Sequence, residues 1–167
     1  MKKCRSGFTL VELVVVIAII GILTAIVIPT VMNYVKKSRL KHANANAKLV
    51  FNTVTAESAV LISDGVELDV SDSLASGIGI RIEPAMYTSL SGNQKKLAQA
   101  VYKAFEQNGD TSGYCSYVFG NSGTLSFAQW SQNATDSILG QYPDPCRDPD
   151  ASIKSFSSTP YNKNSWG

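Results

Sequence analysis

An uninterrupted apolar run from Leu13 to Val35 most constrains what this chain can fold into. It holds no charged residue over about 23 positions, which is enough for a helix to cross a bilayer core of about 30 Å. Glu12 lies at the start of the run, and a carboxylate at the centre of a bilayer costs about 2.5–3.5 kcal/mol on insertion scales. A simple membrane anchor gains nothing from that cost, so the sequence predicts a partner for the charge of Glu12.

The residues around this run form a recognisable order. A short basic leader with Lys2, Lys3 and Arg5 is followed by Gly7, then by Phe8-Thr9-Leu10-Val11-Glu12, and then by the apolar segment. This order resembles the N-terminus of the type IV filament family, which comprises type IV pilins and the related pseudopilins. Members of that family are made as prepilins with a class III signal peptide. The match covers residues 1–29, and an uncleaved signal anchor is the alternative interpretation.

The resemblance implies that a prepilin peptidase cleaves between Gly7 and Phe8 and then N-methylates the new amine of Phe8. An α-amino group has a pKa of about 7.7–8.0, so this amine is positive at neutral pH. Glu12 is four residues away, about one helical turn. In a filament we expect the amine to pair with Glu12 of the same or an adjacent subunit and to set the register, because an unpaired charge is costly in a dry bundle.

An ordinary secretory signal peptide does not fit the apolar segment. Such a peptide has an apolar region of about 7–15 residues that ends at a small-residue cleavage site. The run here is longer, and no Ala-x-Ala site closes it. Gly21 lowers helix propensity and Pro29 removes a backbone hydrogen bond, so the segment between them is predicted to be the weak part of a kinked helix.

The predicted organisation is an α+β protein in which a long N-terminal helix packs on a small C-terminal domain. Its parts are a leader (1–7), a transmembrane and polymerisation helix (8–35), an amphipathic helix (36–62) and a C-terminal globular domain (63–167). The amphipathic helix places residues at steps of three and four on one face, and these are Leu40, Ala43, Ala47, Val50, Val54, Ser58 and Leu61.

The C-terminal domain is predicted to contain an antiparallel sheet and an extra helix. The helix covers 91–108, with a Ser91/Gln94 capping box and an Asn108-Gly109 stop. Its apolar face consists of Leu97, Ala98, Val101, Ala104 and Phe105. Strands are predicted over 78–82, 114–120, 124–130 and 153–156, with a hairpin turn at 121–123. Residues 63–77 are predicted to be a surface loop.

The three cysteines divide unevenly. Cys4 leaves with the leader, so Cys115 and Cys146 remain in a domain predicted to lie outside the cytoplasm. Pilins often carry a C-terminal disulfide, and the resemblance implies a Cys115–Cys146 bond that ties the hairpin to the C-terminal loop. Two separate buried thiols are the alternative.

Charge and motifs argue against an enzyme or a nucleic-acid-binding protein. Without the leader the chain has 12 basic and 13 acidic side chains, so its basic pI belongs to the precursor. The basic residues between Lys36 and Lys48 favour anionic headgroups over nucleic acid. No catalytic or cofactor motif is present, and His42, the only histidine, excludes a two-histidine metal site. Two readings remain for Asp144, Asp148 and Asp150: a solvated acidic turn or a calcium site.

The resemblance therefore implies a structural subunit that self-assembles into a type IV pilus-like filament. Its implied partners are other copies of itself, a prepilin peptidase, an assembly platform protein, an assembly ATPase and, before assembly, the lipid bilayer. The implied location is first the cytoplasmic membrane, with the C-terminal domain outside, and then an extracellular filament. The alternatives are a pseudopilin of a type II secretion or competence system and a minor, tip-located adhesin.

Overall fold

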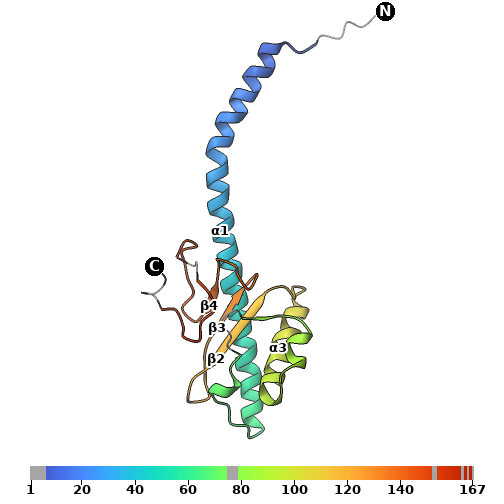
Figure 1. Cartoon of the computed structure of the whole chain (residues 1–167), viewed down its shortest axis with the longest axis vertical. Helices are drawn as coiled ribbons and strands as arrows, with labels where there is room; N and C mark the ends of the chain where they lie inside the picture. Colours follow the sequence, from blue (N-terminus) through green and yellow to red (C-terminus); the bar gives the residue numbers. More distant parts are fainter. Residues whose placement is uncertain (1–6, 75–78, 152–153, 163, 165, 167) are drawn as a thin grey trace, which may run out of the picture. The chain divides into compact units, whose positions relative to one another are not determined.

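The computed structural model describes residues 7–74, 79–151, 154–162, 164 and 166. The chain forms two compact units, Met1–Lys36 and Lys37–Gly167. Helix α1 (Leu10–Ser63) contributes residues to both units, as the blue-to-green ribbon in Figure 1 shows.

In the first unit, α1 runs through Gly21 and Pro29 as a continuous helix. Every described residue of this unit is exposed. The helix begins at Leu10 and not at Phe8, so the predicted start is wrong by two residues. The reason is that Thr9 caps the helix through hydrogen bonds with Glu12.

In the second unit, α1 buries one face, and the predicted amphipathic pattern is confirmed at every position. The buried residues are Leu40, Ala43, Ala47, Val50, Val54, Ser58 and Leu61. The single polar member, Ser58, donates its hydroxyl hydrogen bond to the Val54 carbonyl at 2.6 Å. The helix ends at Ser63, where Gly65 adopts φ +82° and donates to the Ile62 carbonyl at 3.0 Å. Only glycine adopts that conformation without strain.

The sheet has four antiparallel strands in the order β1-β2-β3-β4. The predicted hairpin is confirmed by β2 (Tyr114–Phe119) and β3 (Leu125–Ser131). The predicted 78–82 strand is shortened to β1 (Ile80–Arg81), and its first residue lies outside the described residues. Strand β4 (Gly140–Tyr142) was not predicted. The predicted 153–156 strand is wrong for residues 154–156, which have no regular structure, and Ile153 lies outside the described residues.

Helix α3 (Gly92–Gln107) confirms the extra helix, and it buries Leu97, Ala98, Val101 and Phe105. Its predicted stop is also confirmed, because Gly109 adopts φ +73° and Asp110 donates its N–H to the Phe105 carbonyl at 3.1 Å. The predicted capping box is wrong. The Ser91 side chain forms no cap hydrogen bond, and the Gln94 amide instead donates to the carbonyls of Ser71 and Ser73.

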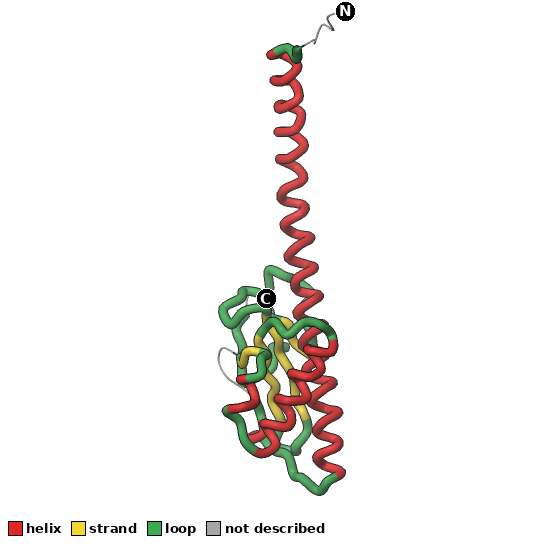
Figure 2. Tube along the Cα trace, turned by 90° about the vertical axis from the view of Figure 1, so that its right-hand side faces the viewer, coloured by secondary structure: helices red, strands yellow, loops and turns green. Residues whose placement is uncertain are grey.

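The stretch predicted as a surface loop contributes to the core. It contains the short 3-10 helix η1 (Val70–Asp72), and Leu68 and Leu74 are buried on either side of it. Leu74 pairs with Tyr117 of β2 through backbone bonds of 2.9 and 3.0 Å. A further short helix, α2 (Ala85–Thr88), precedes α3. In Figure 2 the strands of the second unit lie among the helices and the loops.

Candidate processing and assembly site

The N-terminus of α1 carries a reciprocal capping box between Thr9 and Glu12. The Glu12 Oε2 atom accepts hydrogen bonds from the Thr9 backbone N–H at 2.8 Å and from the Thr9 hydroxyl at 2.7 Å. In return, the Thr9 hydroxyl oxygen accepts the Glu12 backbone N–H at 3.3 Å. These contacts satisfy two of the N–H groups that a helix start leaves unpaired. Our sequence analysis missed Thr9, although the T-x-x-E pattern ahead of an apolar run is the signal for this motif.

The predicted scissile bond lies outside the helix. Gly7 and Phe8 have no regular secondary structure, and Phe8 is 80% exposed. Gly7 and Phe8 are therefore accessible and non-helical, and the helix begins two residues after Phe8, at Leu10, where the capping box fixes its start.

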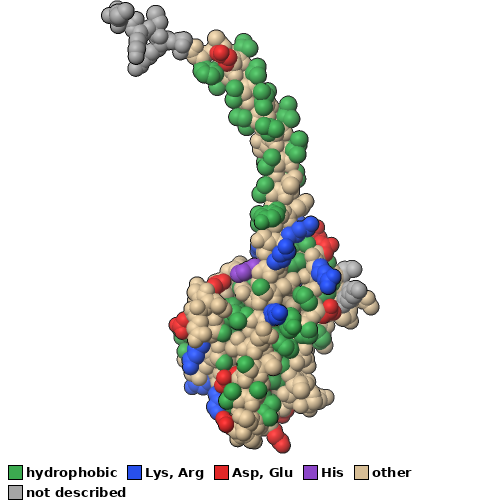
Figure 3. All heavy atoms as spheres, turned by 180° about the vertical axis from the view of Figure 1, so that it is seen from behind, with side chains coloured by type: hydrophobic (Ala, Val, Ile, Leu, Met, Phe, Trp, Pro, Cys, Tyr) green, Lys and Arg blue, Asp and Glu red, His purple; other side chains and the backbone are tan. Residues whose placement is uncertain are grey.

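An unpartnered apolar surface covers the helix of the first unit (Figure 3). Its exposed large side chains include Leu10, Leu13, Ile17, Ile20, Leu23, Ile26, Ile28 and Val31. Within the described part of the chain, α1 is the one helix long and apolar enough to span a membrane, with a mean hydropathy of 3.0 in its most apolar stretch. An apolar surface of this extent needs cover from lipid or from another chain.

Two threonines lie in and beside the segment between Gly21 and Pro29. The Thr24 hydroxyl donates to the Ile20 carbonyl at 2.7 Å, and the Thr30 hydroxyl donates to the Ile26 carbonyl at 3.1 Å. Side-chain bonds to the carbonyl four residues back compete with helical hydrogen bonds and favour bending. They add to the effects of Gly21 and Pro29, and the weakness of this segment remains a prediction.

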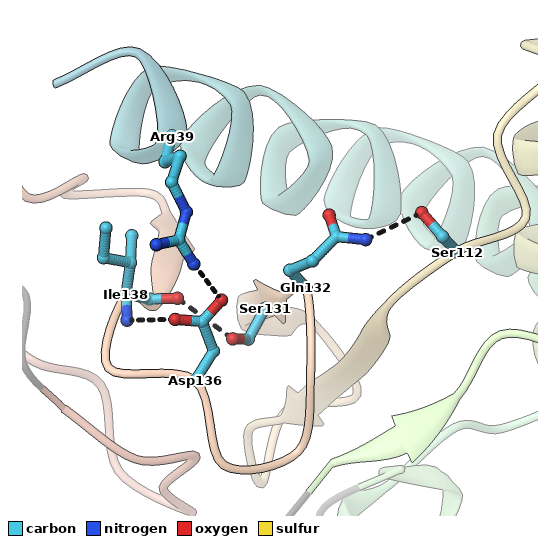
Figure 4. A network of polar contacts seen from close by, with 6 residues as sticks. All are labelled: Arg39, Ser112, Ser131, Gln132, Asp136 and Ile138. Atoms are coloured by element: carbon cyan, nitrogen blue, oxygen red, sulfur yellow. Dashed lines mark hydrogen bonds and ion pairs between the residues drawn. The ribbon is translucent and has the colours of Figure 1, made fainter. Parts of the chain in front are cut away.

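The basic residues after the apolar segment are not equivalent. Lys37 and Lys41 are exposed. Arg39, by contrast, forms an ion pair of 2.7 Å with Asp136, whose side chain is only 6% exposed (Figure 4). Asp136 also accepts the Ile138 backbone N–H at 3.1 Å. Arg39 therefore fastens the loop after β3 to α1, a role that the sequence did not predict.

His42 lies against the sheet, between an aromatic and an acidic side chain. Its ring meets the Trp130 ring edge-to-face at 5.2 Å, and its Nε2 lies 3.8 Å from a carboxylate oxygen of Asp110. Hydrogen bonds from Ser112 hold the pKa of Asp110 below its ordinary value, with His42 a smaller cause. The surroundings of His42 are thus aromatic and acidic.

The predicted disulfide is not formed: Cys115 and Cys146 are both free and buried. Cys115 lies in β2 opposite Trp130, with its side chain in the core. Cys146 lies in the loop after β4, where its thiol donates to the Asp148 carbonyl at 3.1 Å. Burial raises the pKa of Cys115 to about 12. The alternative of two separate buried thiols describes this structure.

The acidic residues around Cys146 do not converge. Asp144, Asp148 and Asp150 are exposed, and Asp148 accepts the backbone N–H of Asp150 at 3.0 Å. Asp144 and Asp148 line a cavity of about 350 Å³ together with Cys146 and Trp166. Within the described ranges, no three acidic, histidine or cysteine side chains gather to bind a metal ion.

The N-terminal segment of the chain matches a known protein family. Residues 2–28 match the family described as the prokaryotic N-terminal methylation motif. A fimbrial protein of Dichelobacter nodosus is 34% identical over 98 residues, which are 58% of this chain and 50% of that protein. Fimbrial protein EcpC of Eikenella corrodens is 26% identical over 150 residues, covering 88% of this chain and 94% of EcpC.

A type IV major fimbrial protein FimA of Dichelobacter nodosus is 55% identical over 40 residues, 24% of this chain and 26% of the relative. The chain thus spans half or less of these two Dichelobacter relatives. No solved structure matches. The chain is therefore similar at its N-terminus to the prokaryotic N-terminal methylation motif and, over longer stretches, to proteins named as fimbrial, in agreement with the predicted resemblance.

Proposed function

We propose that this chain, which is homologous to the type IV fimbrial proteins and carries the N-terminal methylation motif, is the structural subunit of a type IV pilus-like filament. The observation that carries the proposal is the exposed apolar helix of the first unit, which begins at a capping box containing a carboxylate. Such a helix is stable in lipid, and it is equally suited to a bundle of identical helices.

Processing prepares the helix for assembly. A prepilin peptidase cuts the exposed Gly7–Phe8 bond and methylates the amine of Phe8. The new positive charge then lies close to Glu12, because Thr9 already holds the carboxylate at the helix start. Both Thr9 bonds end on Oε2, so the amine of the same or an adjacent subunit approaches the carboxylate at Oε1.

Assembly transfers the apolar helix from the bilayer to the filament core. In the membrane, the Thr9 contacts stabilise the Glu12 carboxylate, which would otherwise be costly in lipid. In the filament, the amine supplies a countercharge at a fixed position, and this pairing sets the axial register. An assembly platform protein and an ATPase drive the transfer. The second unit remains outside the membrane throughout.

The experiment is to shear surface filaments from the native cells and to determine the mass and N-terminal sequence of their subunit. We expect a chain that begins with N-methylated Phe8. Filaments whose subunit begins with Met1 would contradict processing, and filaments that lack this chain would contradict the proposal as a whole.

The same preparation distinguishes a long pilus from the short pseudopilus of a secretion or competence system. The relatives reported above are named as fimbrial proteins, which favours abundant long surface filaments. Electron microscopy with an antibody against residues 37–167 measures the length and abundance of filaments that contain this chain. Only short, sparse filaments would favour the pseudopilus.

A further inference from the structure

A row of buried polar side chains crosses three strands of the sheet. Ser116 of β2 lies opposite Gln129 of β3, and Gln129 lies opposite Gln141 of β4. All three side chains are fully buried. Their neighbours in sequence, Cys115 and Tyr117 in β2 and Ala128 and Trp130 in β3, belong to the hydrophobic core. Because side chains alternate between the faces of a strand, the polar row lies on the opposite face of the sheet.

The two glutamines contact each other and the backbone of the C-terminal segment. The Gln129 amide donates to Gln141 Oε1 at 3.1 Å. Gln141 then binds both polar groups of one residue: its Oε1 accepts the Tyr161 N–H at 2.9 Å, and its Nε2 donates to the Tyr161 carbonyl at 2.6 Å. Gln129 Oε1 accepts the Ser157 N–H at 2.9 Å.

The side chain of Gln141 forms the hydrogen bonds that the backbone of a neighbouring β-strand would otherwise form. Residues 154–157 and 160–162 have no regular secondary structure. A side-chain carboxamide can nevertheless bind their backbone as another peptide group would, because it carries the same hydrogen-bond donor and acceptor. Gln141 pairs with Tyr161 as a neighbouring strand would pair. A fully buried carboxamide without hydrogen-bond partners is destabilising, so the two glutamines require an occupant.

The rings of Phe156 and Tyr161 make two further contacts along the same segment. Phe156 is 5% exposed and packs against the backbone of Gly79, where an added Cβ would lie 2.7 Å from the ring. The Tyr161 ring lies 5.1 Å from the Trp166 ring, and the Trp166 indole donates to the Asp144 carbonyl at 3.2 Å.

We propose that the buried side chains of Gln129 and Gln141 form a binding site for extended polypeptide backbone and that residues 154–162 of this chain are its occupant. The glutamines latch the C-terminal segment to the sheet without a covalent bond. The glutamines bind the backbone groups of Ser157 and Tyr161, so binding requires these two positions of the chain but not their particular side chains. This inference is independent of filament assembly.

Amide hydrogen exchange of the wild-type full chain in detergent micelles is the first test. We expect the Ser157 and Tyr161 amides to exchange at least about a hundredfold more slowly than an unstructured peptide, although neither lies in a helix or strand. Exchange of both amides at the unstructured rate would overturn the proposal without any variant.

Substitution is the second test. Gln141→Leu should speed Tyr161 exchange about tenfold or more, and Gln129→Leu should do the same for Ser157. Gln132→Leu is the matched control and should change neither, because Gln132 lies one residue beyond the end of β3 and its amide donates to the Ser112 hydroxyl. Equal exchange in wild type and both variants would overturn the proposal.

The amides of β2 and β3 report whether a Leu variant has lost the whole sheet. In that case Gln129→Asn and Gln141→Asn replace the Leu variants, because they retain the carboxamide but shorten its reach by one methylene. The same two amides should again lose protection, while those of β2 and β3 keep it. Retained protection at Ser157 and Tyr161 in folded Asn variants would also overturn the latch.

Discussion

At the scale of single residues, the pair Thr9 and Glu12 explains how an acidic side chain is tolerated at the start of an apolar helix. Two hydrogen bonds from Thr9 reach one carboxylate oxygen, and charge-assisted bonds of this type are stronger than neutral ones. Glu12 therefore has a partner before assembly and, in our proposal, a second partner after it.

The first prediction concerns Glu12. Glu12→Gln should enter the membrane and be cleaved, since the peptidase acts at Gly7–Phe8, but it should assemble poorly. Removing one member of a desolvated ion pair costs about 3–5 kcal/mol, so sheared-filament yield should fall more than about tenfold. Glu12→Ala removes the desolvation cost together with the carboxylate, and it should also fail if attraction sets the register. Normal assembly of the Ala variant alone would mean that only the cost of an unpaired charge matters. Wild-type filament yields from both variants would show that Glu12 does not set the register of assembly.

The second prediction concerns Thr9. Thr9→Val keeps the shape of the side chain but loses the hydroxyl, and helix caps contribute about 1 kcal/mol. We expect normal membrane levels and a lower filament yield, with recovery in Thr9→Ser. Thr55→Val is the matched control, because the Thr55 hydroxyl also donates within α1, to the Phe51 carbonyl at 2.8 Å, but lies outside the apolar segment. If both Val variants lower the yield equally, the loss of any hydroxyl explains the effect and the cap does not.

The third prediction concerns Cys115. Its pKa is raised from 9.0 to about 12 by burial, so the folded state retains a proton that the unfolded chain loses. This contribution to stability is complete below pH 9 and declines as pH rises from 9 toward 12. Between pH 9 and 10.5 we expect wild type to lose about 1–2 kcal/mol more than Cys115→Ala. Denaturant titrations at several pH values, with thiol labelling in parallel, provide the measurement. Parallel pH profiles for the two proteins would exclude a buried, protonated thiol.

At the scale of elements, the packing of α1 on the sheet depends on a close approach of two backbones. A Cβ added at Gly140 of β4 would lie 2.1 Å from the carbonyl carbon and oxygen of Ala43. Small residues on both sides, Ala43 on the helix and Gly140 on the strand, allow this contact. Larger side chains at either position would separate the helix from the strand.

Gly140→Ala should therefore destabilise the second unit by about 1–3 kcal/mol or more, since overpacking against backbone cannot relax by rotamer changes. Gly120→Ala is the control, because the nearest atom to a Cβ there is the Ser126 hydroxyl at 3.1 Å, which can rotate away, and the nearest backbone atom, the Thr124 carbonyl oxygen at 3.7 Å, is at an ordinary contact distance. Chemical unfolding followed by tryptophan fluorescence gives both values. Similar stabilities for the two variants would contradict the close helix–strand contact.

Periodic elements could be predicted from the sequence, and contacts between distant side chains could not. The buried face of α1 and the β2–β3 hairpin follow from local patterns of apolar and turn residues. By contrast, β4 has only three residues, and the C-terminal segment contacts Gln129 and Gln141, whose buried amides resemble surface residues in a sequence. The Cys115–Cys146 disulfide was implied by the family resemblance alone, and the structure has both thiols free, because a sequence does not show which cysteine side chains meet.

At the scale of the whole molecule, the described hydrophobic core lies entirely in the second unit. Its members begin at Leu40 and end at Trp166, and no described residue before Leu40 is buried. A chain that starts at Lys37 should therefore fold and remain soluble without lipid or detergent, because it keeps every core residue and removes the exposed apolar surface. Circular dichroism and a single cooperative unfolding transition test this expectation. A fragment that aggregates or lacks a transition would show that the first unit is needed for folding.

The two free, buried thiols bear on how the protein matures in the cell. A subunit whose C-terminal end depends on a disulfide must wait for a thiol oxidant after export, and its assembly stops when that oxidant is lost. Here Cys115 and Cys146 are unlinked, and hydrogen bonds from Gln129 and Gln141 hold the C-terminal segment. Such a subunit is complete as soon as it folds. If the proposed function holds, cells without disulfide-forming enzymes, or grown in a reductant, should therefore still fold this chain and assemble it into filaments.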